Sequence, residues 1–444
     1  MSNELDILRR DFSGDIIEPD NADYAAASRS VLVVGSPAYV LRPKTVADVQ
    51  AAVAFATSAV LPLAVRGGGH AFAGFGTNEG GVVVDLSPLA EVEVLDGHVV
   101  RIGGGATWGQ VATALAPHHL AISSGDTRSV GVGGLTLSGG IGWKVRKHGL
   151  ALDALVAAEV VTADGQVVRT TESDDPDLFW AIRGGGGNFG IVTAFEFAAH
   201  PTTDVFFGRI SFPAAEAEAV LQGWAEYLRT APAELTSIVE LANPFAGGNA
   251  APVEVRVAFD GDDPDLAAQA IDPIRRLGTV LADEVALTAY ADVLVDGIVP
   301  PPGIALFTRS GFVEQASVPE VLRMLAEVGA SERPPFLAVR SLGGAVAEVP
   351  ADATAYAHRS AELMVLTTVA GPKPVVDGAR PGLDALWGRL APHVSGAYAN
   401  FLATATEADV AAVYPAATYD RLAAVKRQYD PGNLFSGNHN VRPA

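Results

Sequence analysis

Apolar residues recur with two different periods along the first 200 residues. Residues 45–60 begin with a Thr/Asp capping pattern and continue with the spacing of an amphipathic helix. Short apolar or alternating runs at 61–65, 80–87, 92–95, 98–102, 158–162 and 190–197 predict strands, and residues 177–182 predict a short helix. The pattern therefore predicts two β-rich lobes with helices at their edges, in one domain over residues 1–200.

The pattern changes after His200-Pro201. Longer segments follow, with helices expected at 213–230, 263–277 and 318–329 and strands at 252–260, 336–342 and 361–369. They predict a second domain over residues 201–400, an antiparallel sheet backed by helices. A last helix at 418–429 is expected to end at Asp430-Pro431-Gly432. These elements together predict an α+β fold.

Composition excludes several classes of protein. The 444 residues are too many for one hydrophobic core, and 49% apolar with 18% charged residues is typical of a globular chain. A net charge of −21 and the lack of a basic patch with interleaved aromatics argue against nucleic acid as a partner. The absence of cysteine excludes disulfides, thiolate metal sites and iron–sulfur clusters.

The sequence also gives no sign of a membrane span, a secretory signal or a metal site. The longest apolar stretch, residues 51–65, is short and broken by polar residues and a proline, and the N-terminus lacks a signal peptide's apolar core. Acidic residues near 174–177 and 262–265 are interpreted as helix caps, not as metal ligands. We therefore expect a soluble, cytoplasmic protein that binds no metal and does not associate with membranes.

Many of the 47 glycines lie in runs at 67–69, 103–105, 131–142 and 184–190. Such runs imply that the backbone there approaches another group closely. Gly185, Gly187 and Gly190 fit the spacing G-x-G-x-x-G, but they follow a predicted helix and open a predicted strand. A dinucleotide fingerprint needs the opposite order. No phosphate-binding P-loop and no G-x-S-x-G nucleophile elbow occur. These absences disfavour a nicotinamide dehydrogenase, a P-loop ATPase and an α/β-hydrolase.

Two of the glycine runs suit a bound cofactor. In RGGGHAFAG (residues 66–74), three glycines after a strand can turn amide groups inward as an anion-binding nest, and Arg66 adds a cation, which suits a pyrophosphate. The alternative is a tight surface loop with a chance histidine. The second run, residues 124–143, has six glycines between positions 131 and 142 among small residues and would pack against a flat ligand. Its alternative is a glycine-rich strand in a tightly packed sheet.

Four segments carry a resemblance to a known family. RGGGHAFAG, VGVGGLTLSGGIGWKVRKHGLALD, DPDLFWAIRGGGGNFGIVTAFEF and YDPGNLFSGNHNV resemble the vanillyl-alcohol-oxidase superfamily, and within it the berberine-bridge-enzyme-like FAD oxidases. The segments keep the family's order and spacing over nearly the whole chain, and the middle domain matches least. The resemblance implies a two-lobed FAD-binding domain, a substrate domain, and a segment 401–444 that returns to the flavin.

The resemblance also assigns residues to the cofactor. His70 takes the place of the histidine whose ring nitrogen bonds covalently to the 8α carbon of FAD. The cofactor-binding positions implied are Arg66, Gly67, Gly68, Gly69, His70, Ala71, Gly74, Thr127, Val130, Gly131, Gly133, Gly134, Leu135, Ser138, Gly139, Gly142, Gly190, Val192, Asn438 and Asn440.

Two departures from the family pattern bear on the chemistry. Thr127 stands where many relatives have a cysteine with a second flavin link, so only the single histidyl link is possible. Ile141 stands where alcohol-oxidising relatives often carry a tyrosine, which makes single-link bacterial relatives such as the 6-hydroxynicotine oxidases the better match. Tyr398 is the first catalytic candidate, as a substrate-orienting group or base, with a core tyrosine as its alternative. Tyr414 is the weaker second candidate, and Phe401 replaces another tyrosine of some relatives.

The resemblance implies an oxidase. A small substrate (alcohol, phenol, sugar or cyclic amine of secondary metabolism) would give a hydride to flavin N5, and molecular oxygen would reoxidise the flavin and yield hydrogen peroxide. The alternatives are a dehydrogenase or oxygenase with the same fold, or a flavin-binding or small-molecule-binding protein without turnover. The substrate, the identity of any catalytic base and the oligomeric state are left open, because fold does not fix them.

Overall fold

The computed structural model describes residues 2–241, 251–297, 300–301 and 303–444. Its first sheet has four strands in the order β1-β2-β4-β3, of which β1 runs antiparallel to β2, and β2 and β3 run parallel to β4. The elements of this lobe are α1 (Ser2–Asp11), β1 (Asp15–Ile17), α2 (Tyr24–Ala27), β2 (Tyr39–Arg42), α3 (Val46–Ser58), β3 (Leu63–Arg66) and β4 (Val82–Asp85).

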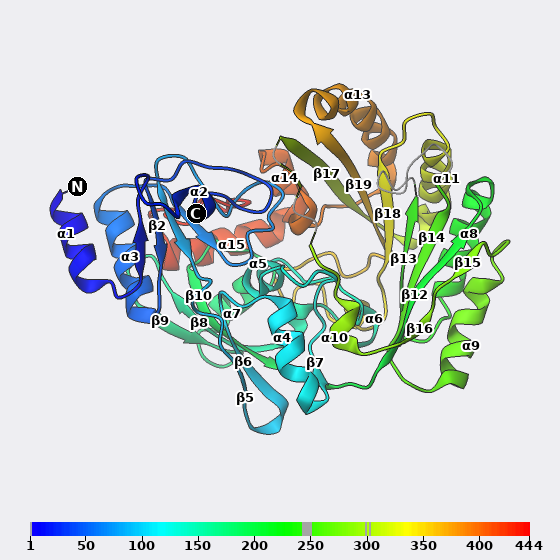
Figure 1. Ribbon diagram of the computed structural model, residues 1–444, viewed down its shortest axis with the longest axis horizontal. Coiled ribbons are helices and arrows are strands. Elements are labelled where there is room, and N and C mark those ends of the chain that lie inside the picture. The colour runs from blue at the N-terminus through cyan, green and yellow to red at the C-terminus, as the bar shows by residue number, and fades with distance from the viewer. Residues whose placement is uncertain (1, 242–250, 298–299, 302) are drawn as a thin grey trace.

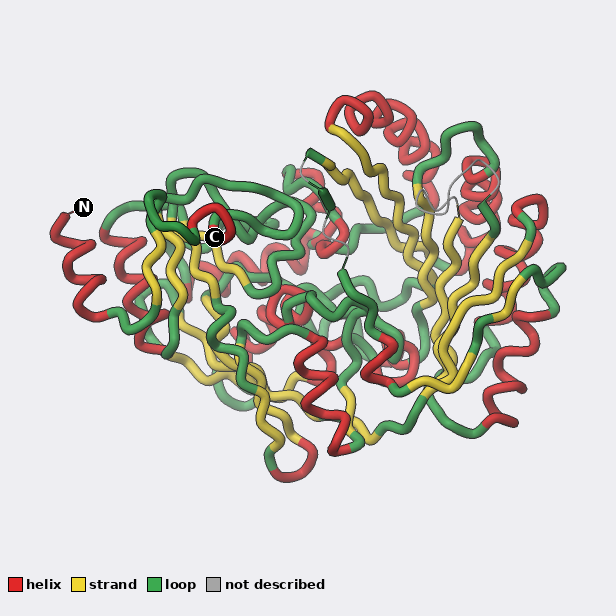
Figure 2. Tube along the Cα trace, viewed as in Figure 1, coloured by secondary structure: helices red, strands yellow, loops and turns green. Residues whose placement is uncertain are grey.

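The second sheet has five antiparallel strands in the order β5-β6-β10-β8-β9. Its lobe contains β5 (Val92–Val94), β6 (Val99–Gly103), α4 (Trp108–Leu115), α5 (Val132–Leu137), α6 (Val145–His148), β8 (Leu155–Val161), β9 (Val167–Thr170), α7 (Pro176–Ile182) and β10 (Ile191–Ala198). A separate two-stranded pair joins β7 (Leu120–Ala121) to β11 (His200–Pro201). The sheets of both lobes lie on one side of the molecule (Figures 1 and 2).

The third sheet lies across the other half of the molecule, with helices on its outer face (Figure 1). It follows the order β15-β12-β14-β13-β18-β19-β17, and β16 also pairs with β12. Its strands are β12 (Val205–Phe212), β13 (Leu235–Leu241), β14 (Val253–Phe259), β15 (Ala282–Asp283), β16 (Ala286–Thr288), β17 (Ile304–Val313), β18 (Phe336–Ser341) and β19 (Leu363–Pro372). The helices of this region are α8 (Ala217–Leu228), α9 (Pro264–Arg275), α10 (Tyr290–Val293), α11 (Val318–Gly329), α12 (Ala345–Glu348) and α13 (Lys373–Leu390).

The four long helices of this region cover one face of this antiparallel sheet. Buried side chains of α8, α9, α11 and α13, such as Trp224, Ile271, Leu322 and Leu386, form one hydrophobic core with the strands beneath them. The opposite face of the sheet turns toward the first two lobes (Figure 1). The predicted α+β class, with a two-lobed part and a helix-backed antiparallel sheet, is confirmed.

The last segment packs against the first part of the chain. It contains α14 (Glu407–Val413) and α15 (Ala416–Tyr429). Tyr414, Leu422 and Val441 share a hydrophobic core with Val100 and Phe179 of the second lobe. The chain terminus therefore lies beside the lobes that precede the third sheet.

The elements expected from local signals are present, but several others were not expected, among them strands β12, β13 and β17. The capping box at Thr45 is present, because its side chain accepts from the Asp48 amide. Helix α13 was not expected, since Pro381 and several glycines interrupt its helical pattern. The acidic residues at 174–177 were wrongly interpreted as caps: Asp175 makes no side-chain bond to its helix and accepts the Tyr429 hydroxyl instead, whereas Asp263 does cap α9.

Candidate active site

A cavity of about 600 Å³ lies where the two lobes, the third sheet and the C-terminal segment meet. Its walls come from β3 and the loop after it, from α5, from the start of β10, from the sheet strands β13, β14, β17, β18 and β19, and from residues 398–402 and 435–439. The volume lies within the range of small-molecule and cofactor sites. We therefore take this cavity as the candidate active site.

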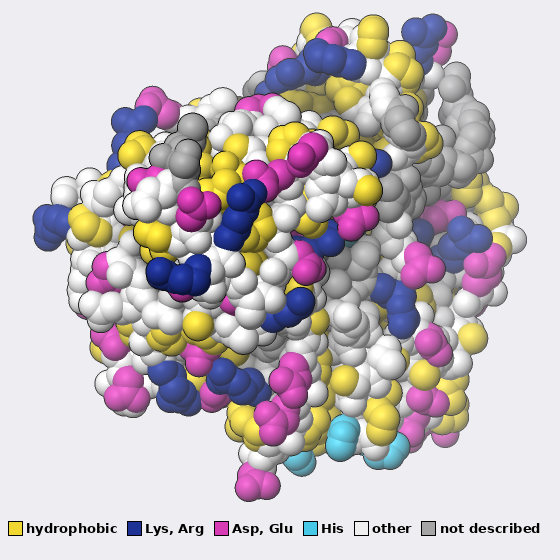
Figure 3. Space-filling model, turned by 60° about the vertical axis from the view of Figure 1, so that its left-hand side comes forward, with side chains coloured by type: hydrophobic (Ala, Val, Ile, Leu, Met, Phe, Trp, Pro, Cys, Tyr) yellow, Lys and Arg dark blue, Asp and Glu magenta, His cyan; other side chains and the backbone are white. Residues whose placement is uncertain are grey.

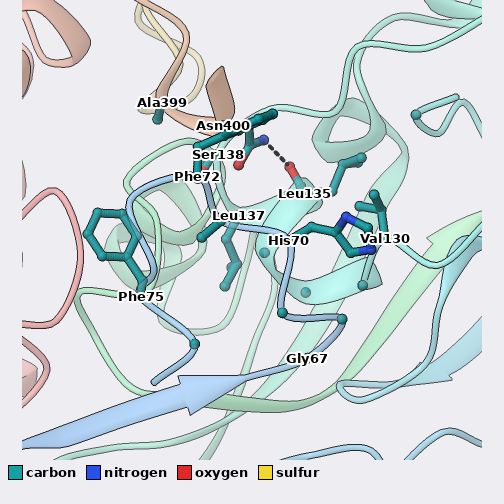
Figure 4. A pocket seen from close by; sticks show the side chains of 18 of the residues that line it. Gly67, His70, Phe72, Phe75, Val130, Leu135, Leu137, Ser138, Ala399 and Asn400 are labelled. Carbon is teal, nitrogen blue, oxygen red and sulfur yellow. Dashed lines mark hydrogen bonds between the residues drawn. The ribbon is translucent and has the colours of Figure 1, made fainter. Parts of the chain in front are cut away.

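The first glycine run forms the edge of the cavity directly after β3 (Figure 4). A side chain on Gly68 would lie 2.3 Å from the Gly131 amide nitrogen, so the two glycine runs touch backbone to backbone. The amide N–H groups of residues 67–71 donate to no described backbone or side-chain acceptor. A row of free amides at a glycine turn suits an anion such as a pyrophosphate.

Arg66 lines the cavity, but its charge is engaged elsewhere. Its guanidinium lies 2.9 Å from the Asp85 carboxylate and also donates to the Arg29 carbonyl at 2.9 Å. The positive charge of Arg66 is only partly compensated, because the Asp85 carboxylate is shared with Arg42, whose Nε lies 3.1 Å from it. An anion bound here would meet the backbone amides and this partly compensated arginine.

His70 points from the first glycine run toward the segment that precedes α5 (Figure 4). Its Nε2 lies 2.9 Å from the Ser129 hydroxyl. Burial lowers the pKa of His70, and an interaction with the Ser129 main chain offsets part of that effect. The ring is therefore neutral at pH 7, which leaves one nitrogen with a free lone pair.

The second glycine run brings most of its expected residues to the cavity. Those that line it are Thr127, Val130, Gly131, Gly133, Gly134, Leu135 and Ser138, and from later in the chain Gly190 and Val192 do so too. Gly67, Gly68, Gly69, His70 and Ala71 complete the set from the first run. Residues 132–137 form helix α5, so this run is neither a bare loop nor a strand.

Four expected cofactor residues do not line the cavity. Gly74, Gly139 and Gly142 are required by packing, because a side chain there would meet Val33, the Tyr398 ring and the Ser124 carbonyl respectively. Asn440 also lies outside the cavity wall, whereas Asn438 lines it. At positions 74, 139 and 142, glycine therefore serves the close packing of the chain on itself and not the wall of the cavity.

His439, between the two asparagines, lines the cavity instead of Asn440. Its Nε2 lies 3.1 Å from the Thr404 carbonyl, and its ring meets the Phe75 ring edge to face at 5.2 Å. Lys426 anchors this segment. Its side chain is fully buried, and its Nζ lies 2.6 Å from Asp430 and 3.0 Å from the Phe435 carbonyl. The terminal motif contained His439, so its sequence signal was present.

Tyr398 lies in the cavity wall just before a 3₁₀ turn at Ala399–Phe401. Its hydroxyl accepts from the Gly140 amide at 2.9 Å and from the Asn400 side chain at 3.0 Å. Burial raises the pKa of Tyr398, although these hydrogen bonds oppose the shift. The side chain is therefore a neutral phenol whose O–H is still available as a donor.

Tyr414 also lines the cavity, on the side of Gly186 and Ser138. Burial raises the pKa of Tyr414 well above its usual range. A buried neutral phenol can donate a hydrogen bond, but it is a poor base at pH 7. Asn400, which bonds both Tyr398 and the Leu135 carbonyl (3.3 Å; Figure 4), was missed although it lies within the AYANF segment.

The third sheet contributes a charged wall that no sequence motif indicated. Glu240 on β13, Arg256 on β14 and Arg340 on β18 line the cavity, together with Asp126 from the second glycine run. Arg340 Nη2 lies 2.6 Å from Asp126 Oδ2, and Arg256 Nε lies 3.3 Å from Glu240 Oε2. Burial raises the pKa of Glu240, and Arg256 offsets part of that shift. This wall is a pair of ion pairs with no net charge.

Other surfaces of the molecule offer less. On the face drawn in Figure 3, acidic and basic side chains are interspersed, and the basic ones do not gather into a stripe. Among the described residues no cluster of histidine and carboxylate side chains could hold a metal ion. No helix in the described ranges combines the length and apolarity that crossing a bilayer requires. The cavity therefore remains the candidate active site.

The chain is similar to known protein families over segments that line the cavity. Residues 37–171 match the family described as "FAD binding domain", and residues 397–442 match the one described as "Berberine and berberine like". The chain is 31% identical to (R)-6-hydroxynicotine oxidase of Paenarthrobacter nicotinovorans, with 97% of each protein covered. It is also 31% identical to xylooligosaccharide oxidase of Thermothelomyces thermophilus, with 92% and 88% covered.

A solved structure supports the same relationship. Glucooligosaccharide oxidase from Acremonium strictum superposes with a TM-score of 0.85 at 26% identity, and the alignment covers 99% of each chain. That structure is described as holding 6-S-cysteinyl, 8α-N1-histidyl FAD. The similarity extends over all parts of the chain that form the cavity.

Proposed function

The chain belongs to the berberine-bridge-enzyme-like FAD-linked oxidoreductases, and from that premise we propose that it is an oxidase whose FAD is bound covalently through His70. Its substrate would be a small organic molecule, and O2 would be the electron acceptor. The observation that carries the proposal is the position of His70, a neutral histidine on the cavity wall within the first glycine run.

The cavity's own residues fit this cofactor. The free amides of residues 67–71 suit the pyrophosphate, and Arg66 beside them adds a positive charge that Asp85, shared with Arg42, only partly compensates. FAD, when bound, supplies the group that takes a hydride from the substrate and passes two electrons to O2. Since the chain has no cysteine, Thr127 cannot form a second link.

Tyr398 is proposed to orient the substrate. Its oxygen accepts the Gly140 amide and the Asn400 side chain, so its O–H is the group left to donate to a substrate heteroatom. A neutral phenol with a raised pKa does not remove a proton at pH 7. This favours a substrate that needs no base, such as an amine, whose nitrogen lone pair drives C–H cleavage, over an alcohol, which needs a base.

The proposal is tested by acid precipitation and by peroxide release. We expect a yellow pellet after acid treatment of the wild-type protein, with a flavin mass on the peptide that contains His70. His70→Ala should leave its flavin in the supernatant, whereas the control His118→Ala, at an exposed histidine, should not. Peroxide formation in air is then measured with panels of cyclic amines, sugars and alcohols. Flavin that is wholly acid-soluble in the wild type contradicts the link, and reduction of a dye without peroxide indicates a dehydrogenase.

A further inference from the structure

Ser129 is the side chain that contacts the ring of His70, and nothing in the glycine motifs assigns it a role. Its Oγ lies 2.9 Å from His70 Nε2. Nε2 is engaged by this contact, so Nδ1 is the ring nitrogen that no hydrogen bond from a described residue occupies. A neutral ring that bonds through Nδ1 carries its hydrogen on Nε2, facing Ser129.

Ser129 is itself held in place by a segment of the third-sheet region. The Val295 amide donates to the Asp126 carbonyl at 2.9 Å, and the Arg128 amide donates to the Val295 carbonyl at 2.8 Å. The Arg128 guanidinium donates to the Ala291 carbonyl at 2.9 Å. These bonds fix residues 126–128, directly before Ser129, on the segment that contains Val295. The hydroxyl of Ser129 therefore meets the His70 ring from a braced backbone and not from a free loop.

The neighbouring Gly297 leaves room for this contact. A side chain at Gly297 would lie 2.5 Å from Ser129 Oγ and 3.1 Å from His70 Cε1. The space beside the histidine is thus filled by serine on one side and by bare backbone on the other. Ser129 is at the same time exposed to solvent. A proton passed from the ring to its hydroxyl has a direct route to water.

We propose that Ser129 is a positioning residue for flavin attachment: it selects Nδ1 of His70 as the nitrogen that bonds to the 8α carbon and receives the proton that Nε2 gives up. This inference rests on the proposed covalent link. In the net step the 8α methyl group and the imidazole each lose one hydrogen as the C–N bond forms. The two electrons and two protons released reduce one O2 to H2O2, so the step is balanced.

The test follows attachment itself and not turnover. Apoprotein of the full chain, made in flavin-starved cells, is mixed with FAD in air, and the acid-stable flavin is followed with time at equal total bound flavin. Ser129→Ala should attach FAD roughly tenfold more slowly than wild type, by analogy with the loss of a hydrogen-bond partner that orients a metal-ligating histidine. Threonine and valine side chains have the same shape, but only threonine has a hydroxyl. We therefore expect Ser129→Thr to attach FAD at about the wild-type rate and Ser129→Val to remain as slow as Ser129→Ala. Ser58→Ala, at an exposed helix-end serine, is the control and should match wild type.

A second readout is the isomer of the histidylflavin, determined by NMR on the isolated flavin peptide. The wild type should give the Nδ1-linked isomer only. Wild-type flavin linked through Nε2 would overturn the inference, as would a Ser129→Ala rate equal to wild type or a threonine variant as slow as the valine variant. Wild-type protein without any acid-stable flavin would instead remove the proposed link at His70, so the two failures are distinguishable.

Discussion

Arg340 of β18 reaches out of the third sheet and places its Nη2 2.6 Å from Oδ2 of Asp126, the residue that precedes Thr127 in the second glycine run. The Arg340 side chain is 11% exposed and that of Asp126 is 31% exposed. This ion pair is a direct polar link between the helix-backed sheet and the segment expected to pack against the flavin. It also holds the Arg340 guanidinium near the ring of Phe401.

The first prediction concerns the pH dependence of this ion pair. Burial alone would raise the pKa of Asp126, but the charge and hydrogen bond of Arg340 lower it overall. The stabilisation is therefore complete above the ordinary aspartate pKa of about 3.9 and is lost as pH falls below it toward the folded-state pKa. We expect Asp126→Asn to lower the free energy of unfolding by about 1–3 kcal/mol at pH 7, with a difference that shrinks below about pH 4. Denaturant unfolding at several pH values measures this.

The control for this prediction is Asp377→Asn, because Asp377 forms an exposed pair with Lys373 on α13. An exposed pair contributes little, so this variant should stay within about 0.5 kcal/mol of wild type. A gap between Asp126→Asn and wild type that widens in acid would contradict the assignment.

Tyr398 yields the second prediction. Tyr398→Phe leaves the buried Gly140 amide without its acceptor, so we expect a loss of about 1–3 kcal/mol in unfolding free energy. Anaerobic flavin reduction measured by stopped flow should slow at least about tenfold with an amine or an alcohol, because the hydroxyl that orients the substrate heteroatom is gone. A variant that an alcohol reduces at the wild-type rate would take Tyr398 out of the reaction.

The third prediction concerns Lys426, which is fully buried with Asp430 and anchors the C-terminal segment. Lys426→Met leaves the Asp430 carboxylate buried without its cation, which should cost about 3–5 kcal/mol in unfolding free energy. Lys373 offers a matched control, since its i,i+4 pair with Asp377 has the same 2.6 Å separation but is exposed. Lys373→Met should change stability by less than about 0.5 kcal/mol. Equal effects of the two variants would mean that burial is not the deciding factor.

The fourth prediction concerns His200, whose ring stacks on His148 at 4.0 Å. Burial, with His148 and Lys144 adding to it and Asp260 opposing it, lowers the pKa of His200 to about 4. The unfolded chain binds a proton near pH 6.5, so between about pH 6.5 and 4 the unfolded state holds more protons and stability falls as pH falls. His200→Gln should flatten that slope in denaturant unfolding. His118→Gln, at an exposed histidine, should leave it unchanged, and a slope unaffected by His200→Gln would refute the linkage.

The sequence by itself determined the features that depend on neighbours along the chain. The capping box of α3 involves residues three positions apart, and the loop from Arg66 to His70 follows its strand directly, so both could be predicted from local pattern. The motif resemblance also put His70 and Thr127 at the site, and both line the cavity. These features can be recognised in the sequence because the residues that interact lie only a few positions apart.

Only the tertiary structure decided which of these residues have groups available to bind a ligand or to react. Arg66 pairs with Asp85, nineteen positions later, which it shares with Arg42, and a side chain at Gly139 would meet the ring of Tyr398. Arg256 and Arg340 flank Ile238 across three strands, so sheet register, and no motif, brings them to one wall with Glu240. Burial and long-range pairing fix charge, protonation and access, and they arise from contacts between segments far apart in the chain, which a local pattern does not encode.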